Sequence, residues 1–200
     1  MAIEGFNYEE FAQTLSTQAS ELVPAYFQEF QKNYVVNTVK NFSLLSAEAI
    51  YNDDKTNFNA DQAMLITQII AEWSFHKSVD IIKSGILPDY WDGIMQKIAF
   101  TIFEISKQSI LKNVPQDEVL RIVEHHVKKT YEKIIGELKD RKIIDQNTFD
   151  QALKQSNIDA MMQEIQEEKA KEEGAAPQHS APGAPAQNDS KILKLASVAL

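Results

Sequence analysis

Cysteine is absent from this chain of 200 residues, and glycine and proline occur only six times each. The absence of cysteine excludes a disulfide framework and thiolate chemistry, and it suits a reducing compartment. Glycine and proline are the residues that interrupt helices, and three of the six prolines lie beyond residue 175. The rest of the chain therefore has few helix breakers, which favours an all-α protein.

Long apolar runs and clustered positive charge are also missing. No stretch approaches 18 consecutive apolar residues, so we expect no transmembrane helix. Residues 1–5 lack the basic and apolar regions of a secretory signal, and we therefore expect a cytoplasmic protein. The net charge of −9 argues against general affinity for nucleic acid, because phosphate contacts need clustered Lys and Arg.

Familiar catalytic patterns are lacking as well. The chain has no Gly-x-Ser-x-Gly elbow, no glycine-rich phosphate loop and no Glu followed by His at the third position. Glu72 and His76 stand one helical turn apart, and we interpret His76 as a structural histidine. His125 and His126 are adjacent, so their side chains point about 100° apart on a helix and do not readily bind one ion together. We predict a protein that is not an enzyme and uses no cofactor or metal.

What the sequence does contain is a pair of long apolar segments between residues 60 and 113. Asn59 and Gln62 have the spacing of a capping box at the start of the first segment. Gly85 and Pro88 stand at the break between the segments, where they would end one helix and begin the next. The first segment carries apolar residues on two opposite sides, which predicts a helix that is buried nearly all round. We expect the two segments to form an antiparallel helical hairpin at the centre of the fold.

Further amphipathic segments flank this hairpin. Asn7 is a candidate cap for a first helix that ends near Pro24, and a second helix follows, with its end between residues 43 and 51 left open. Pro115 begins a helix with an apolar stripe over five turns, which predicts a surface helix with one buried side. We therefore predict a bundle of about five long helices over residues 1–142.

The segment that follows the bundle, residues 137–149, turns the chain through Asp145 or Asn147, either of which is a candidate cap for a short helix. This pattern resembles the short C-terminal helical hairpins, called SHOCT-type, that are appended to many bacterial proteins. Those hairpins usually have Gly where this chain has Lys142 and Glu where it has Thr148. The resemblance implies a helical hairpin and carries no activity. We predict a short helical appendix over residues 143–173, including a last helix with the apolar residues Ile158, Met161, Met162 and Ile165.

The remaining residues read as a tail. Residues 174–190 are rich in Ala, Pro and Gly, which predicts a disordered linker, and residues 191–200 form a short amphipathic peptide with two Lys. The peptide could dock into a groove of its own domain or of a partner, contact an anionic membrane weakly, or have no role. We predict that its apolar residues bind a protein partner: Ile192, Leu193, Leu195, Val198 and Leu200.

Our leading functional hypothesis is a non-enzymatic interaction or scaffold protein that binds a protein partner, or itself, through a helix surface or this terminal peptide. The alternative is a bundle that binds a small apolar ligand among aromatic side chains. Aromatic residues cluster early in the chain and could line such a pocket, although core packing is the explanation that we favour: Phe6, Tyr8, Phe11, Tyr26, Phe27, Phe30 and Tyr34.

Overall fold

The computed structural model describes residues 3, 6–53 and 56–155, and this part of the chain is all-α, as the sequence predicts. The elements are α1 (Tyr8–Leu22), α2 (Glu29–Tyr51), α3 (Ala60–Lys83), the 3₁₀ turn η1 (Pro88–Tyr90), α4 (Trp91–Leu111) and α5 (Gln116–Asp140). Residues 146–155 form a further helical segment at the end of the described chain.

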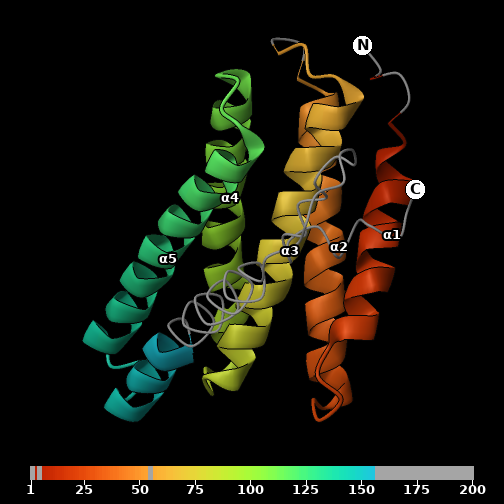
Figure 1. Ribbon diagram of the computed structural model, residues 1–200. Helices are drawn as coiled ribbons and strands as arrows, with labels where there is room; N and C mark the ends of the chain where they lie inside the picture. The colour runs from red at the N-terminus through yellow and green to blue at the C-terminus, as the bar shows by residue number, and fades with distance from the viewer. Residues whose placement is uncertain (1–2, 4–5, 54–55, 156–200) are drawn as a thin grey trace, which may run out of the picture.

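Successive helices run in alternating directions and are arranged in two layers (Figure 1). Helices α1, α3 and α5 lie in one layer, and α2 and α4 lie behind them in the other. The most extensive contacts join helices that are consecutive in the chain, and α3 touches both layers. Helix α3 is therefore the centre of the fold.

The start of α3 matches the pattern in its sequence. The Asn59 side chain accepts a hydrogen bond from the Gln62 backbone N–H at 2.8 Å, and the Gln62 side chain accepts one from the Asn59 backbone N–H at 3.1 Å. This reciprocal capping box satisfies two N–H groups that the first turn of a helix leaves unpaired. Gly85 adopts a φ of +76° just after the helix, a conformation that glycine reaches without steric cost.

The predicted hairpin of α3 and α4 is confirmed, with η1 inserted between Pro88 and the start of α4. Most residues of α3 are buried, because α2 and α4 cover opposite sides of it. Helix α3 packs more extensively on α2 than on α4.

The flanking helices also follow their sequence patterns. The Asn7 side chain accepts from the Glu10 backbone N–H at the start of α1. Helix α2 continues without a break to Tyr51, which settles the end that the sequence leaves open. Helix α5 buries a single stripe that includes Val123, Val127 and Tyr131, so it is a surface helix with one covered side.

After α5 the chain turns at Lys142, whose φ is +60°. Asp145 rather than Asn147 caps the following helical segment, because its carboxylate accepts from the Thr148 backbone N–H at 2.7 Å. These bonds to Thr148 lower the pKa of Asp145. Ile144 and Ala152 are buried in the same apolar core as the bundle. The predicted helix with Ile158, the linker 174–190 and the terminal peptide 191–200 lie outside the described residues.

Candidate interaction surface

The aromatic residues that are close in the sequence divide between the two ends of the bundle. At one end Phe6 contacts Phe11, with ring centroids 5.9 Å apart, and Tyr8 contacts Tyr51. At the other end Tyr34 lies against Trp91, with centroids 4.8 Å apart. The early aromatic residues therefore do not form one common cluster around a ligand.

At the end where α1 meets α2, large apolar side chains are exposed. We name this set the end patch: Leu22, Tyr26, Phe30 and Leu87, with exposed fractions of 54, 73, 51 and 58%. Tyr26 stands over Phe27 in an edge-on contact, and Phe30 stacks almost parallel on Trp91 with an interplanar angle of 4°. Trp91 donates from its indole Nε1 to the Ile86 carbonyl at 2.7 Å, which fixes the ring beside Leu87.

The local sequence explains why these side chains are exposed. Leu22 is the last residue of α1, and Tyr26 lies in the connection to α2, whose first turn contains Phe30. Trp91 and Phe27 occupy the apolar sites beneath and leave the outer faces of these rings in solvent. Three other large apolar side chains are exposed elsewhere on α2 and α4: Leu45, Phe100 and Leu111.

An open depression of about 540 Å³ adjoins the end patch. Its walls come from the α1–α2 connection, the first turn of α2, the end of α3 and the last described residue of the chain: Tyr26, Phe27, Gln31, Ile82, Lys83 and Gln155. A second depression of about 650 Å³ lies between the α3–α4 turn, where it includes Leu87, and the turn around Lys142. Both depressions are shallow surface features of the same end of the molecule.

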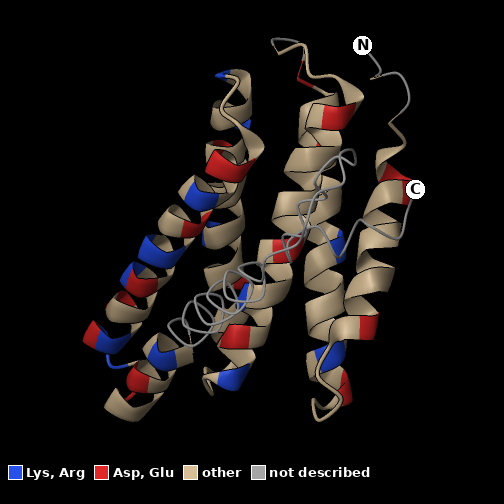
Figure 2. Cartoon of the chain, viewed as in Figure 1, with Lys and Arg blue, Asp and Glu red and all other residues tan. Residues whose placement is uncertain are grey.

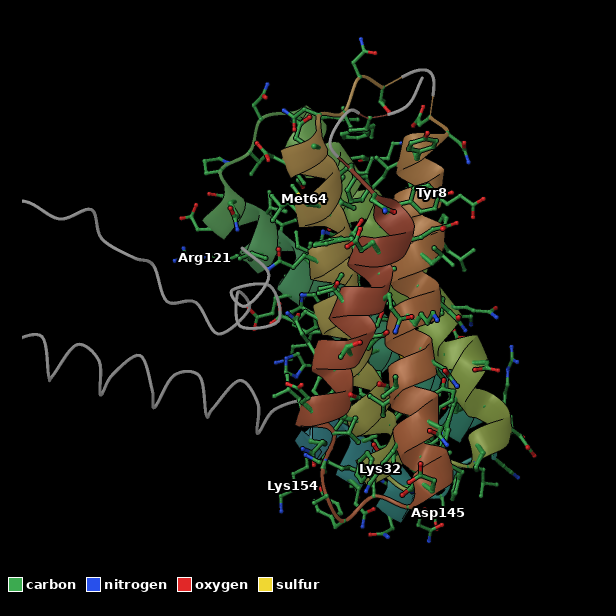
Figure 3. All side chains as sticks on the ribbon, turned by 90° about the vertical axis from the view of Figure 1, so that its right-hand side faces the viewer. Tyr8, Lys32, Met64, Arg121, Asp145 and Lys154 are labelled. Carbon is green, nitrogen blue, oxygen red and sulfur yellow. The ribbon has the colours of Figure 1, made fainter. Side chains whose placement is uncertain are left out.

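Basic and acidic side chains both lie at this end (Figure 2), and Lys32, Asp145 and Lys154 gather there from three separate elements (Figure 3). Lys83 is exposed at the rim of the first depression, and Lys139 and Lys142 line the second. The margin of this surface therefore carries charges of both signs, since Asp145 lines the second depression together with Lys139 and Lys142.

Helix α3 also contains buried charges that the sequence analysis missed. Lys77 and Asp80 form an ion pair with Nζ and Oδ2 2.6 Å apart, and their side chains are 5% and 2% exposed. The ammonium group lies 5.2 Å from the ring centroid of Tyr131 on α5 and 5.9 Å from that of Trp73. The signal in the sequence is the spacing itself, because Trp73, Lys77 and Asp80 follow one another on one side of an otherwise apolar helix.

Tyr131 of α5 packs beside Lys77 and completes the cluster of Trp73, Lys77, Asp80 and Tyr131. Its hydroxyl lies 3.4 Å from Ser84 Oγ, and burial raises its pKa above the usual range of a phenol. These contacts join α3 to α5 in the front layer. No described depression opens onto Lys77 or Asp80, so we interpret the cluster as a structural link.

Glu72 and His76 are close together, as the sequence suggests, but their environments differ sharply. Glu72 is 3% exposed, and its Oε2 has no hydrogen-bond partner within the described chain. His76 is about half exposed, with Nε2 3.7 Å from Glu72 Oε1. Burial raises the pKa of Glu72, and the contact with His76 opposes that shift only in part.

The remaining histidines of the described chain, His125 and His126, are exposed on α5, and their rings stand nearly perpendicular. Among the described residues no group of three or more His, Asp or Glu side chains is placed to hold a metal ion. Within the same residues, no helix has both the length and the apolarity to cross a membrane.

The class that these observations define is an all-α, two-layer helical protein with exposed apolar side chains at one end. No protein family, curated protein or solved structure matches the chain. The resemblance of residues 137–149 to SHOCT-type hairpins therefore rests on their local pattern. The partner-binding residues predicted in the terminal peptide lie outside the described chain: Ile192, Leu193, Leu195, Val198 and Leu200.

Proposed function

We propose that this protein is a non-enzymatic interaction or scaffold protein that binds a protein partner through the end patch. The observation that carries the proposal is the grouping of four exposed apolar side chains at one end of the bundle: Leu22, Tyr26, Phe30 and Leu87. Contiguous exposed apolar surface is a common mark of protein interaction sites, whereas single exposed apolar residues are ordinary.

Two features make this surface suitable for binding. Aromatic residues contribute disproportionately to binding energy when neighbouring groups hold them in place, and Phe30 is held on Trp91 in that way. Lys83, at the rim of the first depression, favours a partner that places an acidic residue beside its apolar anchors. A partner segment with one apolar face would fit the end patch and the adjoining depression.

The terminal peptide, the cellular location and self-association are further parts of this proposal. The terminal peptide 191–200 is a second candidate contact for a protein partner, and at most a weak one for a membrane surface. The cytoplasmic location is supported by the absence of cysteine. Self-association through the end patch is the form of the proposal in which the partner is a second copy.

The test compares three forms of the full chain as affinity baits in an extract of the source cells, with quantitative mass spectrometry as the readout. Tyr26→Ser/Phe30→Ser removes the two exposed rings, and Leu45→Ser/Phe100→Ser is a matched control with equally exposed residues elsewhere. We expect the recovered amount of at least one protein to fall about tenfold or more with the first variant and to stay unchanged with the control. The loss of two aromatic anchors costs several kcal/mol of binding free energy.

Sedimentation velocity on the same three samples separates self-association from binding of another protein. A dimer lost only in Tyr26→Ser/Phe30→Ser would identify the second copy as the partner. Equal recovery of every protein by all three baits, together with the same monomeric mass, would refute the end patch as a binding site. Removing residues 174–200 in parallel tests the terminal peptide, which is rejected if neither the bound proteins nor the assembly state changes.

A further inference from the structure

The described chain ends beside the end patch. Gln155, its last residue, lines the open depression together with Tyr26, Phe27 and Ile82. The next apolar residue, Ile158, follows three positions later and can lie at most about 10 Å further along the chain. The chain therefore continues from a point beside the exposed ring of Tyr26, with Phe27 and Ile82 beneath it.

The sequence of this continuation has one apolar side. Ile158, Met161, Met162 and Ile165 are spaced at intervals of three, one and three, which places them on one face of a helix. Methionine has a flexible thioether that adapts to irregular surfaces and interacts favourably with aromatic rings. Such a face is chemically matched to the exposed ring of Tyr26 and to the apolar wall that Ile82 provides.

The charges of the continuation and of the depression are also complementary. The continuation carries Glu164 and Glu168 at one flank of its apolar face, and the depression has Lys83 at its rim. The terminal peptide is less well suited, because its two Lys would approach Lys83 and because at least 35 residues separate it from Gln155. A short connection gives an effective concentration in the millimolar range, which favours the adjacent segment over both the peptide and a second copy.

We propose that residues 157–165 dock on the depression beside the end patch of their own chain, with Ile158, Met161, Met162 and Ile165 against Tyr26, Phe27 and Ile82. This docking rests on the proposed function in one respect: if the end patch binds an external partner, that partner must displace this segment. In the free protein the segment shields the rings and weakens partner binding by the fraction of time that it is docked.

The absence of cysteine in the chain allows a direct test with a single spin label. Gln163→Cys places a nitroxide on the side of the segment opposite its apolar face, in the otherwise unchanged full chain. Backbone amide intensities of the ¹⁵N-labelled protein are then compared with the nitroxide oxidised and reduced. We expect more than a twofold loss of intensity at Phe27, Gln31 and Ile82, and full intensity at Phe100 and Leu111.

Three further samples complete the test. Adding Ile158→Ser/Met162→Ser to the labelled chain should restore the lost intensities. A mixture of ¹⁵N-labelled chain without cysteine and unlabelled chain with the nitroxide reports contacts between copies; losses found only there would overturn the proposal in favour of a second copy. Losses caused by a label at Ser197→Cys, and not by the label at Gln163→Cys, would assign the site to the terminal peptide instead.

Unchanged intensities with both labels would refute docking altogether. None of these samples contains a partner, so that result leaves the test of partner binding by the end patch untouched.

Discussion

Lys77 and Asp80 show how a charged pair is accommodated in the most buried helix of the bundle. Their side chains are nearly inaccessible, so both ions lose most of their hydration, and their mutual contact at 2.6 Å offsets part of that loss. The rings of Trp73 and Tyr131 lie beside the ammonium group and give it further electrostatic stabilisation. Substituting one member of such a buried pair lowers the free energy of unfolding strongly, whereas substituting both members by apolar residues lowers it little.

The first prediction follows from that asymmetry. Asp80→Ala should lower the free energy of unfolding by about 3–5 kcal/mol, because it leaves the Lys77 ammonium buried without its counter-ion. The matched control Lys77→Met/Asp80→Leu removes both charges and should cost much less, if anything. Urea denaturation of the three proteins measures the difference. Equal destabilisation by the single and double variants would mean that packing, not charge pairing, determines the effect.

Glu72 is the opposite case, a buried carboxyl with an unpaired oxygen. Its pKa is raised in the folded protein relative to the unfolded chain, mainly by burial. The folded state therefore retains the proton to higher pH than the unfolded state, and the stability that this provides is complete below the ordinary pKa of 4.5. It is lost as the pH rises through the raised pKa, so the contribution of Glu72 to the stability of the fold falls from acid towards neutral pH.

The second prediction concerns Glu72→Gln, which keeps the shape of the side chain and removes its charge. We expect the variant to be more stable than the parent by about 1 kcal/mol at pH 7 and to show no gain below pH 4. Urea unfolding across this pH range gives the measurement, and His76→Ala identifies the part that the neighbouring imidazole contributes. A gain that is independent of pH would contradict the assignment to the Glu72 carboxyl.

At the scale of the elements, most helix boundaries could be predicted because they depend on local chemistry. Asn59 with Gln62, Gly85 and Pro115 act through the backbone groups next to them, so their positions in the sequence suffice. The end of α2 could not be predicted, since residues 43–51 are helical because α1 and α3 cover them. The end patch was missed for the same reason: Tyr26 and Phe30 are exposed only because Phe27 and Trp91 occupy the apolar sites beneath them.

The turn after α5 gives the third prediction. Lys142 has a φ of +60°, a conformation that costs an L-residue with a Cβ about 1–2 kcal/mol, and SHOCT-type hairpins usually have glycine at this place. Lys142→Gly should therefore raise the free energy of unfolding by up to about 1 kcal/mol, after allowance for the greater freedom of glycine in the unfolded chain. Asn113 has a φ of +56°, and because asparagine tolerates this conformation, Asn113→Gly should gain less.

Thermal unfolding of the two glycine variants beside the parent tests this ranking. A larger gain at Asn113 than at Lys142, or a loss at Lys142, would show that the Lys142 side chain contributes contacts that outweigh its backbone strain. The result also bears on the candidate surface, because Lys142 lines the second depression at the end patch.

At the scale of the whole molecule, the two-layer arrangement gives the helices unequal shares of the core (Figure 1). Helix α3 is covered by neighbours from both layers, and residues on nearly every side of it are buried. Helix α5 buries one stripe, and residues 146–155 contribute Ala152 as their fully covered side chain. Local stability rises with the number of buried contacts that must be broken to expose an amide, so it should fall from α3 towards residue 155.

The fourth prediction is a gradient of amide hydrogen exchange that follows this order. The amides of α3 from Ile66 to Ile82 should have opening free energies close to that of global unfolding, those of α5 should be lower, and those of residues 149–155 should be lowest among the helices. Exchange measured by NMR on the full chain under conditions in which refolding is fast provides these values. If residues 149–155 exchanged as slowly as α3, the end of the described chain would be part of the cooperative core. The exchange rates of residues 149–155 in the Ile158→Ser/Met162→Ser variant would then show whether the following segment protects them.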